Sequence, residues 1–383
     1  MVELPYGRTP CRADLDGRRI TVVEARRLPP PRPLPVLLDD ALDAPIGHRR
    51  LEELVRQGDR ITIVVSDTSR DVARAALIEA VRARVPSVTW TLAIATGTHG
   101  PCDVTALALP AWMLADATVV NHDGHRPDDL VELGATTRGT PVRIHRCVVE
   151  ADLVIATGCI RPHYFAGFSA GVKAIFPGLG EARAIRHNHA LKVLPGARAG
   201  IVDGNPCRAD LEEAVDLVPS PRFLLDGVCG PDGAIHAAVA GDLRQAFRAG
   251  ADLARGWFTA SAPRAPVVVA SDGLPVTASL YQAAKIAAAV APLVEADGLL
   301  VVVAECADGT GPLDVVNDAI VRIGVLPRLA RGVRLRLVSS LPPDVVGATL
   351  FEHAASVADA IADHPGPVTV VPRASQLLFE ERS

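Results

Sequence analysis

Lysine is nearly absent from this chain of 383 residues. Of its 39 basic residues only three are lysines, at Lys173, Lys192 and Lys285, and the rest are arginines. Arginine keeps its charge, whereas lysine can lose its proton and react as an amine. A sequence that uses so little lysine keeps it where the charge does not matter or where arginine cannot replace it. These three positions are therefore the first candidates for chemistry.

Other scarcities narrow the class of protein. The seven cysteines are scattered and form no CxxC pair, which excludes zinc-finger spacing and predicts reduced thiols in a cytoplasm. No apolar run reaches the roughly 18 residues of a membrane span. The N-terminal residues lack the apolar core of a signal peptide, so we expect a cytoplasmic protein. A net charge of −5 argues against a nucleic-acid partner.

The remaining pattern is that of a soluble α/β protein. With 49% hydrophobic and 22% charged residues, the chain has the composition of a globular fold. Short β-branched runs alternate with amphipathic segments, which predicts mostly parallel sheets. The predicted strands are Arg60–Val65, Val88–Ala95, Ala117–Asn121, Val142–Arg146, Leu153–Ala156, Phe223–Val228, Val267–Ala270, Leu299–Ala304, Val333–Val338 and Val368–Val371. The predicted helices are Arg49–Gln57, Val72–Arg84, Glu181–Val193, Arg208–Leu217, Leu243–Trp257, Ala278–Ala291, Leu313–Ile323 and Leu350–Ala362.

Length and composition breaks predict two domains. At about 150 residues per domain, the chain is long enough for two. The Pro-rich stretch Leu28–Pro35 reads as an extended connector, and a second break lies at Ala260–Pro266. We therefore expect an N-terminal α/β domain over residues 1–262 and a C-terminal α/β domain over residues 263–383. Ligands of such folds sit at the carboxyl ends of strands, often between domains, so we expect the active site in the interdomain cleft.

Three predicted strands of the first domain end in polar segments. The strand Arg60–Val65 leads into Ser66-Asp67-Thr68-Ser69-Arg70 before a helix, an arrangement that can bind an anion or can simply cap the helix. The strand Val88–Ala95 ends in Thr96-Gly97-Thr98-His99-Gly100, where His99 is placed for proton transfer or is a solvated loop residue. The next ends in Asn121-His122-Asp123-Gly124-His125, and its two histidines are weak evidence for a metal.

The densest candidate segment follows the strand Leu153–Ala156. Residues 157–180 are rich in glycine and carry His163 and Lys173, and His189 follows sixteen residues after Lys173. Apolar neighbours could exclude water and depress the pKa of the lysine. The alternative is a surface lysine on a glycine-rich turn. In the second domain, a helix starting near Thr277 would place Tyr281 and Lys285 on one face, although a lysine on an Ala-rich helix is commonly just solvated.

Together these segments resemble the nickel-pincer-nucleotide-dependent lactate racemase family and its 2-hydroxyacid racemase and epimerase relatives. The resemblance rests on motifs that occur in the family's order between residues 67 and 285. They are Asp67-Thr68-Ser69-Arg70, Gly97-Thr98-His99, Asn121-His122-Asp123, the Pro162-His163 to Pro177-Gly178 loop with Lys173, His189, Gly204-Asn205-Pro206 and Tyr281-Gln282-Ala283-Ala284-Lys285. Each motif is weak alone, and their ordered combination is specific.

The resemblance implies a role for each matching residue. Lys173 resembles the lysine that carries the nickel-pincer nucleotide covalently, and His189 resembles the histidine that ligates its nickel. His99 and His163 resemble the paired acid/base histidines on opposite faces of the substrate. Asp67, Thr68 and Arg70 resemble the turn that holds the nucleotide phosphate, while Tyr281, Gln282 and Lys285 resemble residues of the C-terminal domain that line the substrate and cofactor site.

The implied activity is inversion of the Cα centre of a 2-hydroxyacid. The Cα hydrogen of an ionised hydroxyacid is not acidic enough for direct abstraction, so reversible hydride transfer to a tethered cofactor is a sensible route. The expected partners are a small 2-hydroxyacid and the proteins that synthesise the cofactor, and neither nucleic acid nor membrane is expected. Two alternatives remain open: an enzyme that uses Lys173 for Schiff-base chemistry on a keto acid, and a non-catalytic protein that binds a nucleotide or metabolite.

Overall fold

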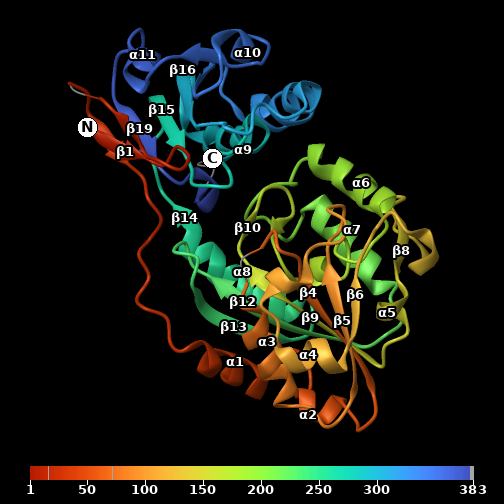
Figure 1. Ribbon diagram of the computed structural model, residues 1–383. Coiled ribbons are helices and arrows are strands. Elements are labelled where there is room, and N and C mark those ends of the chain that lie inside the picture. Colours follow the sequence, from red (N-terminus) through yellow and green to blue (C-terminus); the bar gives the residue numbers. More distant parts are fainter. Residues whose placement is uncertain (16, 71, 380–383) are drawn as a thin grey trace. The chain divides into compact units, whose positions relative to one another are not determined.

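A computed structural model describes residues 1–15, 17–70 and 72–379, and the chain divides into two compact units. One unit comprises Arg27–Trp257, and the other comprises Met1–Arg26 together with Phe258–Ser383 (Figure 1). The predicted boundary after residue 262 lies close to this division. The prediction differs for the first 26 residues, which it placed in the N-terminal domain and which the structure groups with the C-terminal unit.

The unit Arg27–Trp257 is built on a six-stranded sheet with the order β13-β12-β9-β4-β5-β6. Its five parallel strands are β4 (Arg60–Ser66), β5 (Thr89–Ala95), β6 (Thr118–Asn121), β9 (Leu153–Ile160) and β12 (Arg222–Cys229), and the edge strand β13 (Ile235–Gly241) is antiparallel. Every residue of β9 is buried, as its nearly continuous apolar sequence requires of a strand covered on both faces. The predicted α/β class with mostly parallel sheets is confirmed.

The order of these strands creates a natural ligand site. From β4 the chain adds β5 and then β6 on one side, whereas β9 and β12 lie on the other side of β4. The carboxyl ends of β4 and β9 therefore diverge into connections that leave in opposite directions, which is where open α/β sheets bind ligands. The helices of this unit are α1 (Leu34–Asp43), α2 (Leu51–Leu54), α3 (Arg74–Arg82), α4 (Ala111–Asp116), α5 (Arg146–Val149), α6 (Ala182–Ala190), α7 (Pro206–Asp216) and α8 (Gln245–Phe258).

Two short hairpins extend the unit beside the sheet. They are β7 (Leu130–Ala135) with β8 (Pro141–His145), and β10 (Pro162–His163) with β11 (Gly167–Phe168). The second hairpin is followed by a helical turn at Gly171–Ala174, which carries Lys173. The glycine-rich segment is therefore ordered by strand pairing on one side of Lys173 and by a helical turn around it.

The other unit has its own sheet, in which all six strands are parallel. Its order is β18 (Glu352–Ala354), β17 (Arg334–Val338), β16 (Val294–Val303), β15 (Ala265–Ser271), β19 (Val368–Val371) and β3 (Ile20–Val22). Its helices include α9 (Leu280–Val290), α10 (Pro343–Gly347) and α11 (Val357–Ile361). A helical segment spans Val315–Val325. Smaller pairings are β1 (Val2–Leu4) with β2 (Cys11–Ala13), and β14 (Thr259–Ala260) with β20 (Leu378–Phe379).

The predicted helix Leu350–Ala362 is wrong in its first part. Glu352–Ala354 is the edge strand β18, and only Val357–Ile361 is helical, with the hydroxyl of Ser356 accepting from the amide of Asp359 at the start of that helix. Glu352 pairs with Arg334 and Arg336 of the neighbouring strand β17. These cross-strand contacts favour the extended conformation and could not be read from the local sequence.

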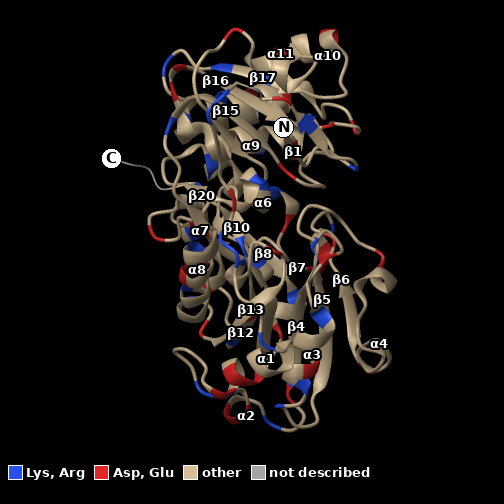
Figure 2. Ribbon diagram, turned by 90° about the vertical axis from the view of Figure 1, so that its left-hand side faces the viewer, with Lys and Arg blue, Asp and Glu red and all other residues tan. Residues whose placement is uncertain are grey.

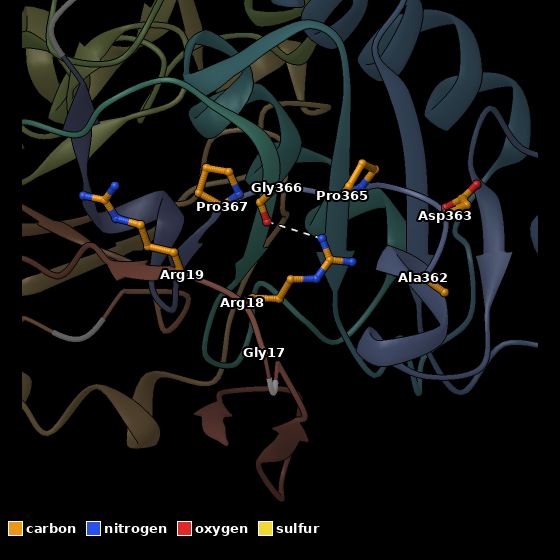
Figure 3. A pocket seen from close by; sticks show the side chains of 8 residues that line it. All are labelled: Gly17, Arg18, Arg19, Ala362, Asp363, Pro365, Gly366 and Pro367. Atoms are coloured by element: carbon orange, nitrogen blue, oxygen red, sulfur yellow. Dashed lines mark hydrogen bonds between the residues drawn. The ribbon is translucent and has the colours of Figure 1, made fainter.

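The first 26 residues are integral to the C-terminal unit. Strand β3 extends the sheet by pairing with β19, and Leu4, Ala13 and Leu15 are buried in its core. Arg18 donates to the carbonyl oxygens of Ile361, His364 and Gly366. Figure 3 shows Arg18 lining a pocket together with Gly17, Arg19, Ala362, Asp363 and the segment Pro365–Pro367. Because its guanidinium is committed to backbone carbonyls, Arg18 ties the chain terminus to this unit.

Charged residues of both signs are interspersed along the helices and loops of each unit (Figure 2). Many form surface ion pairs, such as Arg84 with Asp39, Asp43 and Glu52. None of the helices in the described part of the chain combines the length and the apolar character needed to cross a bilayer.

Candidate functional site

A cavity of about 200 Å³ lies in the unit Arg27–Trp257, at the carboxyl ends of β4, β5 and β9. It brings together six of the predicted site residues, which are Asp67, Arg70, His99, His163, Lys173 and His189. Asp67 and Arg70 follow β4, His99 follows β5, and His163 and Lys173 follow β9. Because these strands are parallel neighbours, residues far apart in the sequence meet at one edge of the sheet.

The loop around Lys173 packs directly on the loop after β5. The amide of Gly97 donates to the carbonyl oxygen of Gly178 over 2.9 Å. A Cβ atom at Gly178 would lie 2.1 Å from the carbonyl oxygen of Ala174 and 2.7 Å from the Cβ of Ala95, so only glycine permits this approach. Gly97 itself has a φ of +58°, which also favours glycine. The glycines therefore bring the His99 loop against the Lys173 loop.

His99 is paired with the buried carboxylate of Asp67. The Nδ1 atom of His99 lies 2.7 Å from Oδ2 of Asp67, and the amide and hydroxyl of Ser69 donate to the other carboxylate oxygen. The hydrogen bond to Asp67 raises the pKa of His99. Burial acts to raise the pKa of Asp67, but the hydrogen bonds from His99 and Ser69 outweigh it and lower that pKa. With 60% of its side chain exposed, His99 can still reach a ligand.

Arg74 supports the turn that carries Asp67 and Arg70, and this role was not predicted from the sequence. It lies at the start of α3, is buried, and donates to the carbonyl oxygens of Ser66, Asp67 and Arg70. Three bonds from one guanidinium fix the turn that carries Asp67 and Arg70. An arginine in the first turn of a predicted amphipathic helix reads as an ordinary surface residue, so the sequence held no signal for this role.

His163 differs from His99 in its surroundings. Its Nδ1 accepts a hydrogen bond from the amide of Ala166 over 3.2 Å, so the proton of the neutral ring lies on Nε2. Burial lowers the pKa of His163 well below its ordinary value, and the nearby charges of Lys173 and Arg70 act in the same direction. His163 is therefore a neutral ring that presents an Nε2–H group.

Lys173 has the environment of a reactive amine. Burial lowers its pKa well below the ordinary value, and the positive charges of Arg208 and Arg70 lower it further. Its ammonium group lies 5.7 Å from the centre of the Phe165 ring. The neutral amine is the nucleophilic form of lysine, so the site favours the state that can be bonded covalently.

His189 reaches the cavity from helix α6. Burial lowers its pKa to about 4, and Lys173 and Lys192 contribute in the same direction. Its Nδ1 is buried without a hydrogen-bond partner among the described residues. The neighbouring Asn188 is fully buried and donates to Asp210, which also accepts from Thr136 and Thr140. This buried network anchors α6 and was not predicted from the sequence.

Phe165 packs against several of these side chains. Its ring centre lies 4.7 Å from that of His163 and 4.9 Å from that of His189, both edge to face. Phe165 was expected only as one of the apolar residues of the segment 157–180. Its ring contacts both imidazoles and lies near the amine of Lys173, so it restricts where these side chains can lie.

The other predicted site residues lie elsewhere. Thr68 is exposed on the turn after β4 and does not line the cavity. Tyr281, Gln282 and Lys285 lie on α9 of the other unit, where Lys285 donates to Gln282 and lies 5.5 Å from the centre of the Tyr281 ring. The predicted shared helical face is thus present, and the part of these three residues in the site stays a prediction.

His122 and His125 have different surroundings. His122 is buried, and its Nε2 hydrogen-bonds to the carbonyl oxygen of Gly180, whereas His125 is exposed. Within residues 1–15, 17–70 and 72–379, no group of three or more His, Cys, Asp or Glu side chains is arranged to hold a metal ion. His122 instead ties the loop after β6 to the end of the Lys173 loop.

The expectation of reduced thiols fails at one pair of cysteines. Cys159, at the end of β9, forms a disulfide with Cys229, at the end of β12. These strands are parallel neighbours whose register places Cys159 opposite Gly227, two residues from Cys229. The spacing of 70 residues hid the pair from sequence analysis. Because Cys159 also lines the cavity, the crosslink lies at the site itself.

Comparison with known proteins points to one family. A sequence model described as the lactate racemase N-terminal domain matches residues 6–200. The chain is 29% identical over 346 residues to a lactate racemase of Thermoanaerobacterium thermosaccharolyticum, covering 84% of this chain and 81% of that protein. It is also 29% identical over 283 residues to a lactate racemase of Lactiplantibacillus plantarum, covering 72% of this chain and 66% of that protein.

Solved structures show the same likeness. The structure of the lactate racemase apoprotein from T. thermosaccharolyticum matches with a TM-score of 0.86 and 26% identity, over 99% of this chain and 100% of that one. A protein from Thermotoga maritima matches with a TM-score of 0.65 and 15% identity, over 91% of this chain and 97% of that one, and shows the fold alone.

Proposed function

Because this chain belongs to the lactate racemase family and is therefore an isomerase of the racemase type, we propose that it inverts the Cα centre of a small 2-hydroxyacid with a covalently tethered nickel-pincer nucleotide. Lactate is the first substrate to test, because both curated relatives are lactate racemases. The observation that carries the proposal is the meeting of His99, His163, Lys173 and His189 around one cavity.

The residues of the cavity fit this cofactor. Lys173 offers a neutral amine for covalent attachment, which an arginine could not supply. His189 offers an imidazole whose low pKa keeps it unprotonated at neutral pH and whose Nδ1 has no partner among the described residues, as suits a nickel ligand. The exposed guanidinium of Arg70 can meet the phosphate of the nucleotide or the carboxylate of the substrate. When bound, the group supplies reversible acceptance of a hydride from the substrate carbon.

The two histidines act differently on the substrate oxygen. The Nδ1–H group of His99 donates a hydrogen bond to Asp67, which leaves Nε2 to accept the proton of the substrate hydroxyl. Asp67 also stabilises the imidazolium that then forms, as a carboxylate does in an Asp–His pair. His163, a neutral ring with its proton on Nε2, can donate a hydrogen bond to the oxygen on the other face. In the return step the His99 imidazolium gives the proton back to the substrate oxygen, so both rings end in the states in which they began.

Asp67 therefore has a different role from the one expected. The resemblance implied that the turn at Asp67 holds the nucleotide phosphate, but a buried carboxylate would repel a phosphate. Its bonds to His99 and Ser69 favour a role in orienting His99. Arg70 remains the anion-binding residue of that turn. The roles that the resemblance gives to Tyr281, Gln282 and Lys285 stay predictions.

The proposal is tested on protein produced together with the cofactor-synthesis proteins. We expect bound nickel, a mass increase confined to the peptide that contains Lys173, and interconversion of the two lactate enantiomers measured by chiral chromatography. Lys173→Arg should lose all three, whereas the matched control Lys192→Arg should keep them. Protein that carries neither nickel nor the added mass would overturn the proposal.

The lowered pKa of Lys173 also favours a second candidate, Schiff-base chemistry on a keto acid. In that case borohydride with pyruvate would reduce an imine and leave a stable adduct on Lys173 of protein made without the cofactor. The nickel-dependent proposal predicts no such turnover-linked adduct. The same peptide, examined in the two preparations, therefore separates the two chemistries.

A further inference from the structure

Lys173 follows a backbone segment in an unusual conformation. Ala170 has a φ of +64° and a ψ of −160°, a region occupied almost only by glycine, and Gly171 also has a φ of +64°. Such a conformation persists only where the surroundings impose it. The amide of Lys173 donates a hydrogen bond of 3.3 Å to the carbonyl oxygen of Ala170. The conformation of Ala170 therefore determines the position of the Lys173 backbone.

One buried carboxylate supports this segment through a hydrogen bond. Asp226, on β12, is fully buried, and its Oδ2 accepts a hydrogen bond of 2.9 Å from the amide of Gly171. Its Oδ1 has no partner among the described residues, and a Cβ atom on Gly158 would lie 3.3 Å from it and 3.1 Å from the Cβ of Ala170. The carboxylate thus packs closely against Gly158 and Ala170, both of which line the cavity.

Arg208 completes the support. It is fully buried on α7, donates to the carbonyl oxygens of Ala166 and Phe168, and lies over the ring of Phe247, which itself packs against Gly171. Burial raises the pKa of Asp226 to about 7, which shows how costly a carboxylate is at this position. Hydrophobic residues would be cheaper here if the position served packing alone.

From this geometry we propose that Asp226 is a positioning residue for Lys173: its hydrogen bond to the Gly171 amide imposes the Ala170–Gly171 conformation and so keeps the lysine amine inside the cavity. The inference deepens the proposed function, because it rests on Lys173 being the attachment point. In this role Asp226 acts through the backbone of Gly171 and makes no contact with the substrate.

The experiment uses the full chain made without the cofactor and reads the amine directly. Reductive methylation is followed by peptide mass spectrometry over a pH series, which gives the apparent pKa of Lys173, with Lys192 as the internal reference. Asp226→Leu removes the acceptor and should raise the apparent pKa of Lys173 by about one unit or more as the amine meets water. Asp226→Asn keeps an acceptor for the Gly171 amide and should stay close to the wild type.

Two further variants separate positioning from general stability. Asp210→Asn alters an equally buried carboxylate in the same unit that bonds to Thr136, Thr140 and Asn188, and should lower the melting temperature without changing the profile of Lys173. Ala170→Gly removes the cost of the positive φ, so the effect of Asp226→Leu should be smaller in that background. If Asp226→Leu does not fold, Asp226→Ser replaces it, because its hydroxyl is too short to reach the Gly171 amide.

A folded Asp226→Leu or Asp226→Ser protein with an unchanged Lys173 profile would overturn the inference, as would an equal effect of Asp226→Asn. These outcomes are independent of the proposed function, because methylation reports the lysine whether or not a cofactor ever binds it. Conversely, a protein that never acquires nickel but shows the predicted profiles would contradict the proposed function and leave the role of Asp226 standing.

Discussion

At the scale of single residues, the two histidines of the cavity are in chemically different states. His99 has a raised pKa because it donates to Asp67, whereas burial lowers that of His163. A pair with opposite shifts can hold one protonated and one neutral imidazole at the same pH. The difference arises from one hydrogen bond at each ring: a carboxylate on Nδ1 of His99, and a backbone amide on Nδ1 of His163.

This contrast gives a prediction for Asp67→Asn. Losing the carboxylate should lower the pKa of His99, measured by NMR of the ring nitrogens, and leave the signal of the half-buried His145 in place. The acid limb of the pH–rate profile should move to lower pH, because unprotonated His99 is the active base. We expect kcat to fall by about 10²-fold, since the ring is no longer oriented.

The stability of the protein should depend on pH through the contact between His99 and Asp67. Because the pKa of His99 is raised in the folded state, its contact with Asp67 stabilises the fold fully below the ordinary value of 6.5, and this contribution is lost as the pH rises through the folded pKa. The stability difference between Asp67→Asn and the wild type should therefore become smaller at high pH, where the bonds from Ser69 to Asp67 remain. An unchanged difference across that range would show that the pair is not coupled to folding.

At the scale of elements, the local sequence predicted the polar residues that follow the strands. It did not predict the buried residues that support them. Polar residues after β4, β5 and β9 could be read directly, because parallel strands bring their carboxyl ends to one edge. Arg74, Asp226 and Asp210 could not, because their partners are backbone groups or side chains far away in the sequence. A buried carboxylate inside a predicted strand gives no sign of which amide it will meet.

Three other elements show the same limit. The strand at Glu352–Ala354 was read as helix because its pairing with β17 depends on residues 16 to 18 positions away. The antiparallel edge strand β13 and the helix α1 were not predicted, since each takes its place from tertiary packing. Central strands, whose apolar runs are long and buried on both faces, were all found.

The disulfide between β9 and β12 gives a prediction at this scale. It closes a loop of 70 residues, and in the chain-entropy account such a crosslink stabilises the fold by about 4 kcal/mol. Peptide mapping without reductant should find Cys159 linked to Cys229. Cys229→Ala should lower the free energy of unfolding by that order in urea, and reductant should then have no further effect. Equal stability of the wild type with and without reductant would contradict this.

At the scale of the whole molecule, the chain builds one unit from a continuous segment and the other from both of its ends. Arg27–Trp257 contains the complete six-stranded sheet and every lining residue of the cavity. The second unit takes β3, Leu4 and Leu15 from the first 26 residues. A boundary drawn at one point along the sequence could not describe this arrangement, because the sequence does not show which sheet a short terminal strand will join.

This arrangement predicts how fragments behave. Residues 27–257 alone should fold, with cooperative unfolding by circular dichroism and a methylation profile of Lys173 like that of the full chain. Residues 258–383 alone should not, because they lack an edge strand and two fully buried leucines worth about 2 kcal/mol each.

Joining residues 1–26 to the fragment 258–383 through a flexible linker should restore cooperative unfolding. Arg18→Ala in the joined fragment should lower its stability, since three carbonyl oxygens would lose their donor. Cooperative folding of residues 258–383 without residues 1–26 would show that the terminal segment is not needed for this unit to fold.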